Sequence, residues 1–192
     1  TGNDSVLEQA ILKSVARPLA LGNVRLLYDA DTTAGSIFSR LPFIPDVLVR
    51  NVYADNSIAG VIHINNIQSP FFVLSVTSYG NSFSGMLSWE ASMPYTLDTL
   101  FPSYPSSVLS NATSSTQVGT TTKSVATTTS SVNVQGGFRD EVVGNHDVRV
   151  YRDSEGRSVI LYGYWDRSTL IIARDSKAFI EIIQRIAHSR SK

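Results

Sequence analysis

The sequence predicts an α+β domain in which a largely antiparallel mixed sheet is covered by amphipathic helices. Three observations favour this class. Hydrophobic residues make up 42% of the 192 residues and charged residues only 17%, which supplies enough apolar side chains for a core. Apolar positions follow a helical spacing in some segments and alternate as in strands in others. Short turn signals join several successive strands, as they do in antiparallel sheets.

Residues 1–105 show the order helix, strand, helix, strand, strand, helix. Ser5 and Glu8 fit a capping box, in which the two side chains satisfy backbone N–H groups at the start of a helix. Arg17-Pro18 ends this first helix, because the residue before a proline is pushed out of the α region. The apolar face of the helix consists of Leu7, Ala10, Ile11 and Val15.

The following segment combines a strand with an interrupted helix. Residues 23–29, NVRLLYD, predict the strand. Residues 32–52 predict a helix that Pro42 and Pro45 interrupt, and Pro45 can begin a new helical turn. The side chains expected to face inward after Pro45 are Val47, Leu48 and Val52.

A hairpin and a helix complete the first half of the chain. Residues 57–66 and 70–79 predict two strands joined by a polar turn around Asn66–Ser69. Asn81 is the expected N-cap of a helix over residues 82–93, and residues 94–101 add a short helical turn. The apolar positions of these helices are Phe83, Met86, Leu87, Leu97, Leu100 and Phe101.

Residues 138–192 predict a strand meander followed by one helix. The expected strands are residues 138–143, 146–153, 158–166 and 168–174. The expected turns are Gly144-Asn145, Asp153–Gly156 and Asp166–Ser168. Asp175 caps the final helix, whose apolar stripe consists of Phe179, Ile182, Ile183, Ile186 and Ala187.

Residues 106–137 form a Ser/Thr-rich tract between the two halves, with Lys123 as its only charged residue. The tract predicts either a flexible linker, because it lacks the apolar mass to offset its ordering entropy, or an exposed Thr-rich hairpin, because Thr and Val favour strands. Each flanking half alone offers only a thin core. We therefore expect residues 1–105 and 138–192 to be the two halves of a single α+β domain.

Composition excludes several classes of function. The formal net charge is +0, and a protein that neutralises nucleic-acid phosphates needs a basic surplus, so we expect no nucleic-acid partner. The chain has no cysteine, which excludes disulfides, thiolate catalysis and zinc sites built on cysteine. No run of about 18 apolar residues is present to span a membrane. The first residues, TGNDSVLEQ, suggest that a longer natural protein has been trimmed.

The candidate catalytic or metal-binding residues lie around His146. Asp140, Glu141 and Asp147 lie close to it in the sequence, and one histidine with three carboxylates can bind a divalent metal or act as a general base. Ordinary solvated turn residues explain the same pattern, so the sequence assigns no catalytic or metal-binding residue, and His146 with these carboxylates is kept only as the alternative. No phosphate-binding glycine loop, nucleophile elbow or dinucleotide motif is present, so the sequence predicts no cofactor.

The candidate binding residues are the aromatics Tyr162, Tyr164 and Trp165. Strand alternation predicts Ile160, Tyr162 and Tyr164 on one face of the sheet, with Leu161 and Trp165 near the other. Aromatic rings on a sheet can form a ligand platform, but we favour core packing as the role of these side chains.

Two segments, together roughly a third of the chain, are GMLSWEASMPYTLDTLF and the stretch from NHDVRVYRD to IIQRI. These segments resemble an uncharacterised group of membrane-anchored extracytoplasmic proteins from ultrasmall candidate-phylum bacteria. The matching positions in the first are Met86, Leu87, Trp89, Glu90, Met93 and Phe101. Those in the second are Asn145, Asp147, Arg149, Gly156, Leu161, Tyr162, Asp166, Thr169, Leu170 and Ile171. The long Ser/Thr tract departs from the group, in which we expect a shorter join.

The resemblance implies a bacterial extracytoplasmic or cell-surface location, with a membrane anchor elsewhere in the full-length protein. Together with the absence of a catalytic motif, it favours a non-catalytic envelope domain that contacts protein partners as a scaffold, adhesion module or surface-assembly subunit. The alternatives are an envelope hydrolase or metal-dependent enzyme centred on the His146 loop, and a ligand-binding module that uses the sheet aromatics.

Overall fold

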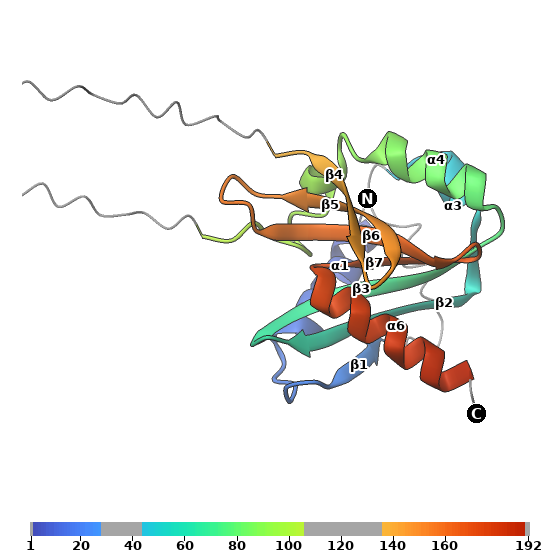
Figure 1. Cartoon of the computed structure of the whole chain (residues 1–192). Coiled ribbons are helices and arrows are strands. Elements are labelled where there is room, and N and C mark those ends of the chain that lie inside the picture. Colours follow the sequence, from blue (N-terminus) through green and yellow to red (C-terminus); the bar gives the residue numbers. More distant parts are fainter. Residues whose placement is uncertain (1, 28–43, 106–135, 191–192) are drawn as a thin grey trace, which may run out of the picture.

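The computed structural model of the chain describes residues 2–27, 44–105 and 136–190. The strands are β1 (Val24–Leu27), β2 (Val52–Ile64), β3 (Ile67–Val76), β4 (Phe138–Val143), β5 (His146–Arg152), β6 (Ser158–Asp166) and β7 (Thr169–Ala173). The helices are α1 (Gly2–Ala16), α3 (Asp46–Val49), α4 (Tyr79–Trp89), α5 (Met93–Thr96) and α6 (Ser176–Arg190). Within these residues the strands form one open sheet (Figure 1). The predicted mixture of helices with a mostly antiparallel sheet is confirmed.

The sheet joins strands from both sides of the Ser/Thr tract. Its order is β1-β2-β3-β7-β6-β5-β4, and every neighbouring pair is antiparallel. The central pair is β3 with β7, in register from Phe72 opposite Ile172 to Ser75 opposite Thr169. The strands of residues 1–105 and those of residues 138–192 therefore meet in the middle of one hydrogen-bonded ladder.

Two hairpins close with two-residue turns in the left-handed region. Gly144 and Asn145 have φ values of 57° and 65°, and Val143 and His146 face each other across the turn. Positive φ at both central residues gives a turn whose twist matches the flanking strands. The turn predicted at Gly144-Asn145 is confirmed. The other turn is formed by residues 65–66 with φ values of 51° and 61°, so the predicted turn at residues 66–69 was placed too late.

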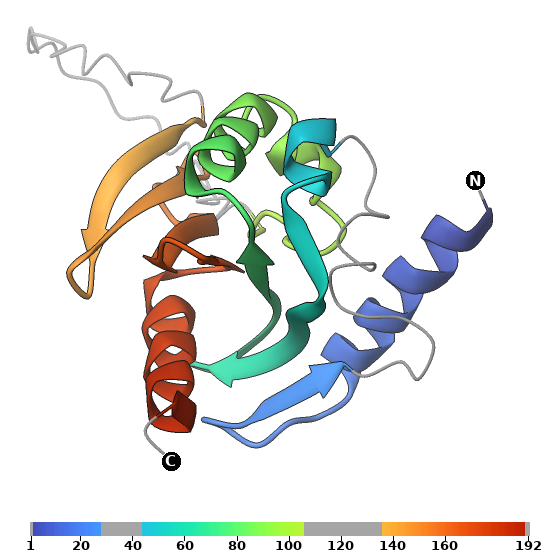
Figure 2. The same cartoon turned by 90° about the vertical axis from the view of Figure 1, so that its right-hand side faces the viewer.

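Hydrophobic residues of the sheet face two cores, one on each side. Figure 2 shows the helices that cover them, with α4 in green and α6 in red on different sides of the sheet. On β3, Phe72 and Leu74 pack with α1, α3, α4 and α5, whereas Phe71 and Val73 pack with α6. We call these sides the α4 face and the α6 face. Because successive strand residues point to opposite faces, a strand covered on both sides is apolar at nearly every position. β7 follows this rule, since all five of its residues are buried.

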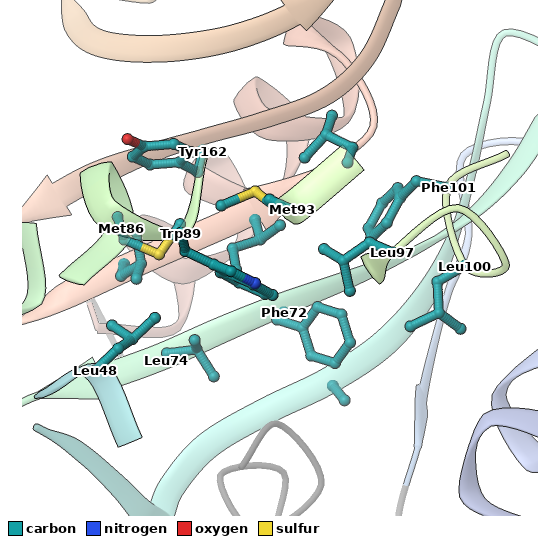
Figure 3. Packing of buried hydrophobic residues seen from close by; sticks show 14 of the residues in the cluster. Leu48, Phe72, Leu74, Met86, Trp89, Met93, Leu97, Leu100, Phe101 and Tyr162 are labelled. Atoms are coloured by element: carbon teal, nitrogen blue, oxygen red, sulfur yellow. The ribbon is translucent and has the colours of Figure 1, made fainter. Parts of the chain in front are cut away.

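Helix α4 and the short α5 cover the middle of the α4 face. Trp89 is fully buried there, over β3 and close to Met86, Met93 and Phe72 (Figure 3). The helix predicted over residues 82–93 is interrupted, because α4 ends at Trp89 and Met93 begins α5. The reason is Pro94, which has no N–H to donate and whose ring would clash with the carbonyl of Glu90 in a continuous helix.

The start of α4 and the start of β2 also differ from the prediction. The N-cap of α4 is Ser78, whose hydroxyl accepts a hydrogen bond from the backbone N–H of Asn81 at 3.4 Å; Asn81 itself lies in the helix. Val52 opens β2 opposite Val76 instead of ending a helix. After Pro45 only residues 46–49 are helical, and the rest of the predicted helix up to residue 43 lies outside the described residues.

Helix α6 forms the layer on the α6 face. The Asp175 carboxylate accepts hydrogen bonds from the N–H groups of Lys177 and Ala178 at 3.0 and 2.9 Å, so the predicted cap is confirmed. Phe179 and Ile182 are buried, whereas Ala187 of the predicted stripe is exposed. None of the helices in the described ranges is both long and apolar enough to cross a bilayer.

Residues at the two ends of the Ser/Thr tract contact β5, the β5–β6 turn and Arg174, which follows β7. The ring of Tyr104 lies 4.8 Å from the guanidinium of Arg157 and 4.4 Å from that of Arg174. Gly136 lies so close to β5 that an added Cβ would be 2.6 Å from the hydroxyl oxygen of Tyr151. The predicted linker or Thr-rich hairpin itself lies outside the described residues up to residue 135.

The shared ladder predicts that residues 138–192 do not fold alone. In that fragment β7 would lose β3, and Tyr162, Leu170 and Ile172 would lose the helices that bury them on the α4 face. A fragment that lacks one side of its core lacks a cooperative transition. We expect thermal melting followed by circular dichroism to be gradual for the fragment and sigmoidal for the whole chain. A cooperative transition in the fragment would contradict a single domain.

Candidate functional site

A bidentate ion pair connects the end of α4 to strand β5. Nε of Arg149 donates to Oε1 of Glu90 at 2.7 Å, and Nη2 donates to Oε2 at 2.6 Å. The two side chains are only 20% and 15% exposed. Two parallel charge-assisted hydrogen bonds fix both distance and orientation. Glu90 follows α4 directly as its C-cap, so the pair sets where the helix lies above the outer strands.

Two further side chains complete the network around this pair. The hydroxyl of Tyr162 donates to Oε1 of Glu90 at 2.6 Å, and Nη1 of Arg149 donates to Asp140 at 2.9 Å. Burial, and then the hydrogen bond to Glu90, raise the pKa of Tyr162 well above its ordinary value. The hydrogen bond to Glu90 likewise raises the pKa of Arg149. Tyr162 therefore remains a donor and Arg149 a cation at physiological pH.

A hollow of about 720 Å³ lies between α4 and the β4–β5 hairpin. We call it the aromatic hollow. Helix α4 contributes Tyr79 and Phe83, and β6 contributes Tyr162 and Tyr164. The hairpin contributes Asp140, Glu141, Val142, His146, Asp147 and Arg149. The hollow thus has an aromatic wall and a wall that carries most of its charges.

Three rings of the aromatic wall contact one another. Tyr79 and Phe83 stack with centroids 5.7 Å apart, and Tyr164 meets the ring of Tyr79 edge to face at 4.8 Å. The Tyr164 hydroxyl donates to Oγ of Ser82 at 2.9 Å, which fixes its ring against α4. Tyr79 is 44% exposed, so part of this aromatic cluster faces solvent.

A second hollow, of about 830 Å³, lies on the other side of the ion pair. We call it the α5 hollow. Its walls include Glu90, Tyr95, Asp98 and Phe138. Since Glu90 lines this hollow and Arg149 lines the aromatic hollow, the ion pair between them forms the partition.

The predicted aromatic residues lie on two faces. Tyr162 and Tyr164 pack with the core of the α4 face, and Trp165 packs with that of the α6 face, as strand alternation predicted. Tyr162 is only 1% exposed, and its hydroxyl is hydrogen-bonded to Glu90. Tyr164 instead forms part of the aromatic cluster. The sequence did not single out Tyr79, Phe83 or the Glu90–Arg149 pair as parts of a site.

The four residues of the alternative site around His146 all line the aromatic hollow, but their side chains do not form one cluster. The His146 ring lies toward the α6 face, edge to face with Phe179 at 6.2 Å, and its Nδ1 is 3.2 Å from the carbonyl oxygen of Tyr164. Glu141 is bound by Arg152 through two hydrogen bonds of 2.8 Å, and Asp140 by Arg149. Within the described residues, no three histidine, aspartate or glutamate side chains are placed to hold a metal ion.

The ion pair predicts a large effect of Glu90→Ala on stability. The substitution leaves the mostly buried guanidinium of Arg149 and the hydroxyl of Tyr162 without their main partner. Loss of one member of a largely buried pair should lower the free energy of unfolding by about 2–3 kcal/mol. Urea denaturation followed by tryptophan fluorescence measures this change, because Trp89 is adjacent and buried.

The matched control is Glu181→Ala, which breaks the more exposed pair of Glu181 and Arg185 on α6. Exposed pairs of this kind contribute less than about 1 kcal/mol. An equally small effect for Glu90→Ala would show that the Glu90–Arg149 pair does not hold α4 in place.

Because the Tyr164 hydroxyl is buried, we expect the folded protein to lose stability at alkaline pH. Burial is the main cause that raises the pKa of Tyr164 to about 12 from the ordinary value of 10. The folded state thus holds this proton more tightly than the unfolded state, so the contribution to stability is complete below pH 10 and is lost as the pH rises toward 12. In urea denaturation at a series of pH values, Tyr164→Phe should lose less stability over this interval than the unsubstituted protein.

Tyr95→Phe is the control for this measurement. Tyr95 is 85% exposed and meets nearly the same solvent in the folded and unfolded states. The substitution should leave the pH dependence of the free energy of unfolding unchanged. Equal pH profiles for Tyr164→Phe and the unsubstituted protein would contradict the expected contribution of Tyr164.

Comparison with known proteins identifies no relative of this chain. No family model, no curated protein and no solved structure matches it. What the chain does must therefore be inferred from its own side chains, above all from the two hollows and the ion pair between them.

Proposed function

We propose that this chain is a non-catalytic domain of a membrane-anchored bacterial envelope or surface protein and that it acts by binding another protein. The observation that carries the proposal is the pair of hollows on the α4 face, separated by the Glu90–Arg149 pair. Protein-binding surfaces combine hollows, exposed aromatic or aliphatic side chains and a rigid support. This face has all three.

Exposed apolar side chains gather at these hollows. Tyr79 is 44% exposed and Val142 70% exposed at the aromatic hollow. Leu87 is 42% exposed and Tyr95 85% exposed at the α5 hollow. Large side chains grouped in this way mark interaction sites more often than single exposed residues do. A partner that covers them would remove their apolar surface from water.

The geometry offers less support for the enzyme alternative. A general base must reach the proton that it removes, and a nucleophile needs a base at hydrogen-bond distance. The His146 ring packs edge to face with Phe179 of α6, and two of its three neighbouring carboxylates in the sequence are bound by arginines. His146 and these carboxylates line one hollow, but only Asp147 among the three has no arginine partner within the described residues.

The proposed location rests on composition and on the resemblance. A chain without cysteine cannot be altered by thiol oxidation outside the cytoplasm. The neutral Ser/Thr tract has the composition of extracellular linkers. The resemblance to membrane-anchored envelope proteins points to the same compartment.

Site-directed photo-cross-linking tests the proposal. A photoreactive amino acid at Val142, in the full-length protein in its native cells, should form a discrete adduct with one envelope or surface protein. Tyr79→Ala should reduce that adduct, because Tyr79 lines the same hollow. The control position is Lys177, which is exposed on α6 at the opposite face and should give no such adduct. No adduct from Val142, or equal adducts from both positions, would contradict the proposal.

A metal titration tests the enzyme alternative directly. Zinc, manganese or calcium should not change the melting temperature of the purified domain. Stabilisation by one of these metals that disappears in His146→Ala would instead support a metal-dependent site at His146.

A further inference from the structure

We propose that the partner inserts a lysine or arginine side chain into the aromatic hollow, between the aromatic cluster of Tyr79, Phe83 and Tyr164 and the carboxylates of Asp140 and Asp147. The proposal rests on the protein-binding function proposed above and specifies the chemistry of the partner. The occupant is a basic segment of another protein.

The charges around the two hollows favour a cationic occupant. Five acidic residues line them, Glu90, Asp98, Asp140, Glu141 and Asp147, whereas Arg149 is the only lysine or arginine among the lining residues. Glu90 is neutralised by Arg149, and Glu141 is bound by Arg152. This leaves an acidic surface on a protein whose formal net charge is +0. Such a surface attracts basic segments and repels acidic ones.

Two of the remaining carboxylates are open to a ligand. Asp140 keeps 87% of its side chain exposed despite its contact with Arg149. Asp147 is exposed, and within the described residues neither a salt bridge nor a side-chain hydrogen bond engages its carboxylate. A cation in the hollow can therefore gain a carboxylate partner without breaking an existing ion pair of Asp147.

The aromatic wall adds a second source of attraction for a cation. The face of an aromatic ring is negative, so an ammonium or guanidinium group within about 6 Å of its centroid is stabilised. The long stems of lysine and arginine can also pack against rings while their charged ends reach a carboxylate. The chain makes this contact internally, since the guanidinium groups of Arg157 and Arg174 lie 4.8 and 4.4 Å from the centroid of Tyr104.

The arrangement of the hollows favours a protein segment over a free metal ion. Residues of β4 line both hollows, Asp140 and Val142 in one and Phe138 in the other. Within the described residues β4 pairs only with β5 and forms an edge of the sheet. An extended segment along this edge would meet both hollows in turn, with its basic side chain in the aromatic hollow and its next side chains near the α5 hollow.

Peptide binding tests this inference. The probe is a fluorescein-labelled peptide of alternating lysine and serine, compared with peptides that carry glutamate or alanine in place of lysine. In anisotropy titrations with residues 1–192, the lysine peptide should bind at least about tenfold more tightly than either comparison peptide. Asp147→Asn and Tyr79→Ala should each weaken binding of the lysine peptide by about fivefold.

Asp46→Asn is the matched control, because it removes one carboxylate that is 88% exposed on α3, outside both hollows. It should leave binding within about twofold of the unsubstituted protein. An equal effect of Asp46→Asn and Asp147→Asn would mean general charge attraction and would overturn the inference. So would a lysine peptide that binds no better than the alanine peptide.

The outcomes for the two proposals are separable. A cross-linked partner at Val142 whose contacting segment carries no lysine or arginine would support the protein-binding function and overturn the basic occupant. Specific binding of the lysine peptide without any protein adduct at Val142 would support the cation site and contradict the protein-binding function.

Discussion

The hydrogen-bonded pair of Glu90 and Arg149 is the contact on which the shape of the α4 face depends. Helix α4 follows β3 in the middle of the sheet, whereas Arg149 belongs to β5, which is separated from β3 by β7 and β6. The pair therefore reaches across two strands, and Tyr162 of the intervening β6 donates to the same carboxylate. The pair fixes the distance between α4 and β5 and so keeps a hollow open on each side of itself. Without this fixed distance, apolar side chains of the helix and the strands would pack together and fill the hollows.

The β4–β5 hairpin shows why the two faces of the sheet have different roles. On its α6 face, Val143, Val148 and Val150 are buried beneath α6. On its α4 face, Asp147 and Arg149 alternate with these valines and lie at the aromatic hollow. Strand alternation thus lets one short sequence, Asp147 to Val150, supply core contacts on one side and charged groups on the other. The edge of the sheet is stabilised by α6 and remains polar and accessible toward α4.

Local signals predicted the parts of the fold that depend on neighbouring residues. The turn at Gly144-Asn145, the cap at Asp175 and the two faces of β6 each follow from a few consecutive residues. The end of α4 at Trp89 was predicted four residues too late, because the prediction continued this helix to Met93. The site could not be predicted in the same way, because Glu90 is 59 positions from Arg149 and 72 from Tyr162. Only the pairing of β3 with β7 brings these residues together, and no periodicity in one sequence specifies that pairing.

The same contacts join two distant parts of the sequence into one support. Glu90, which directly follows α4, bonds Arg149 of β5 and Tyr162 of β6. Trp89 and Leu170, from the same two parts of the chain, are buried in the core of the α4 face. Tyr79 lies at the other end of α4, is partly exposed and lines the aromatic hollow. The buried contacts and the ion pair therefore fix where α4 lies, and exposed side chains such as Tyr79 determine which surface the hollow offers.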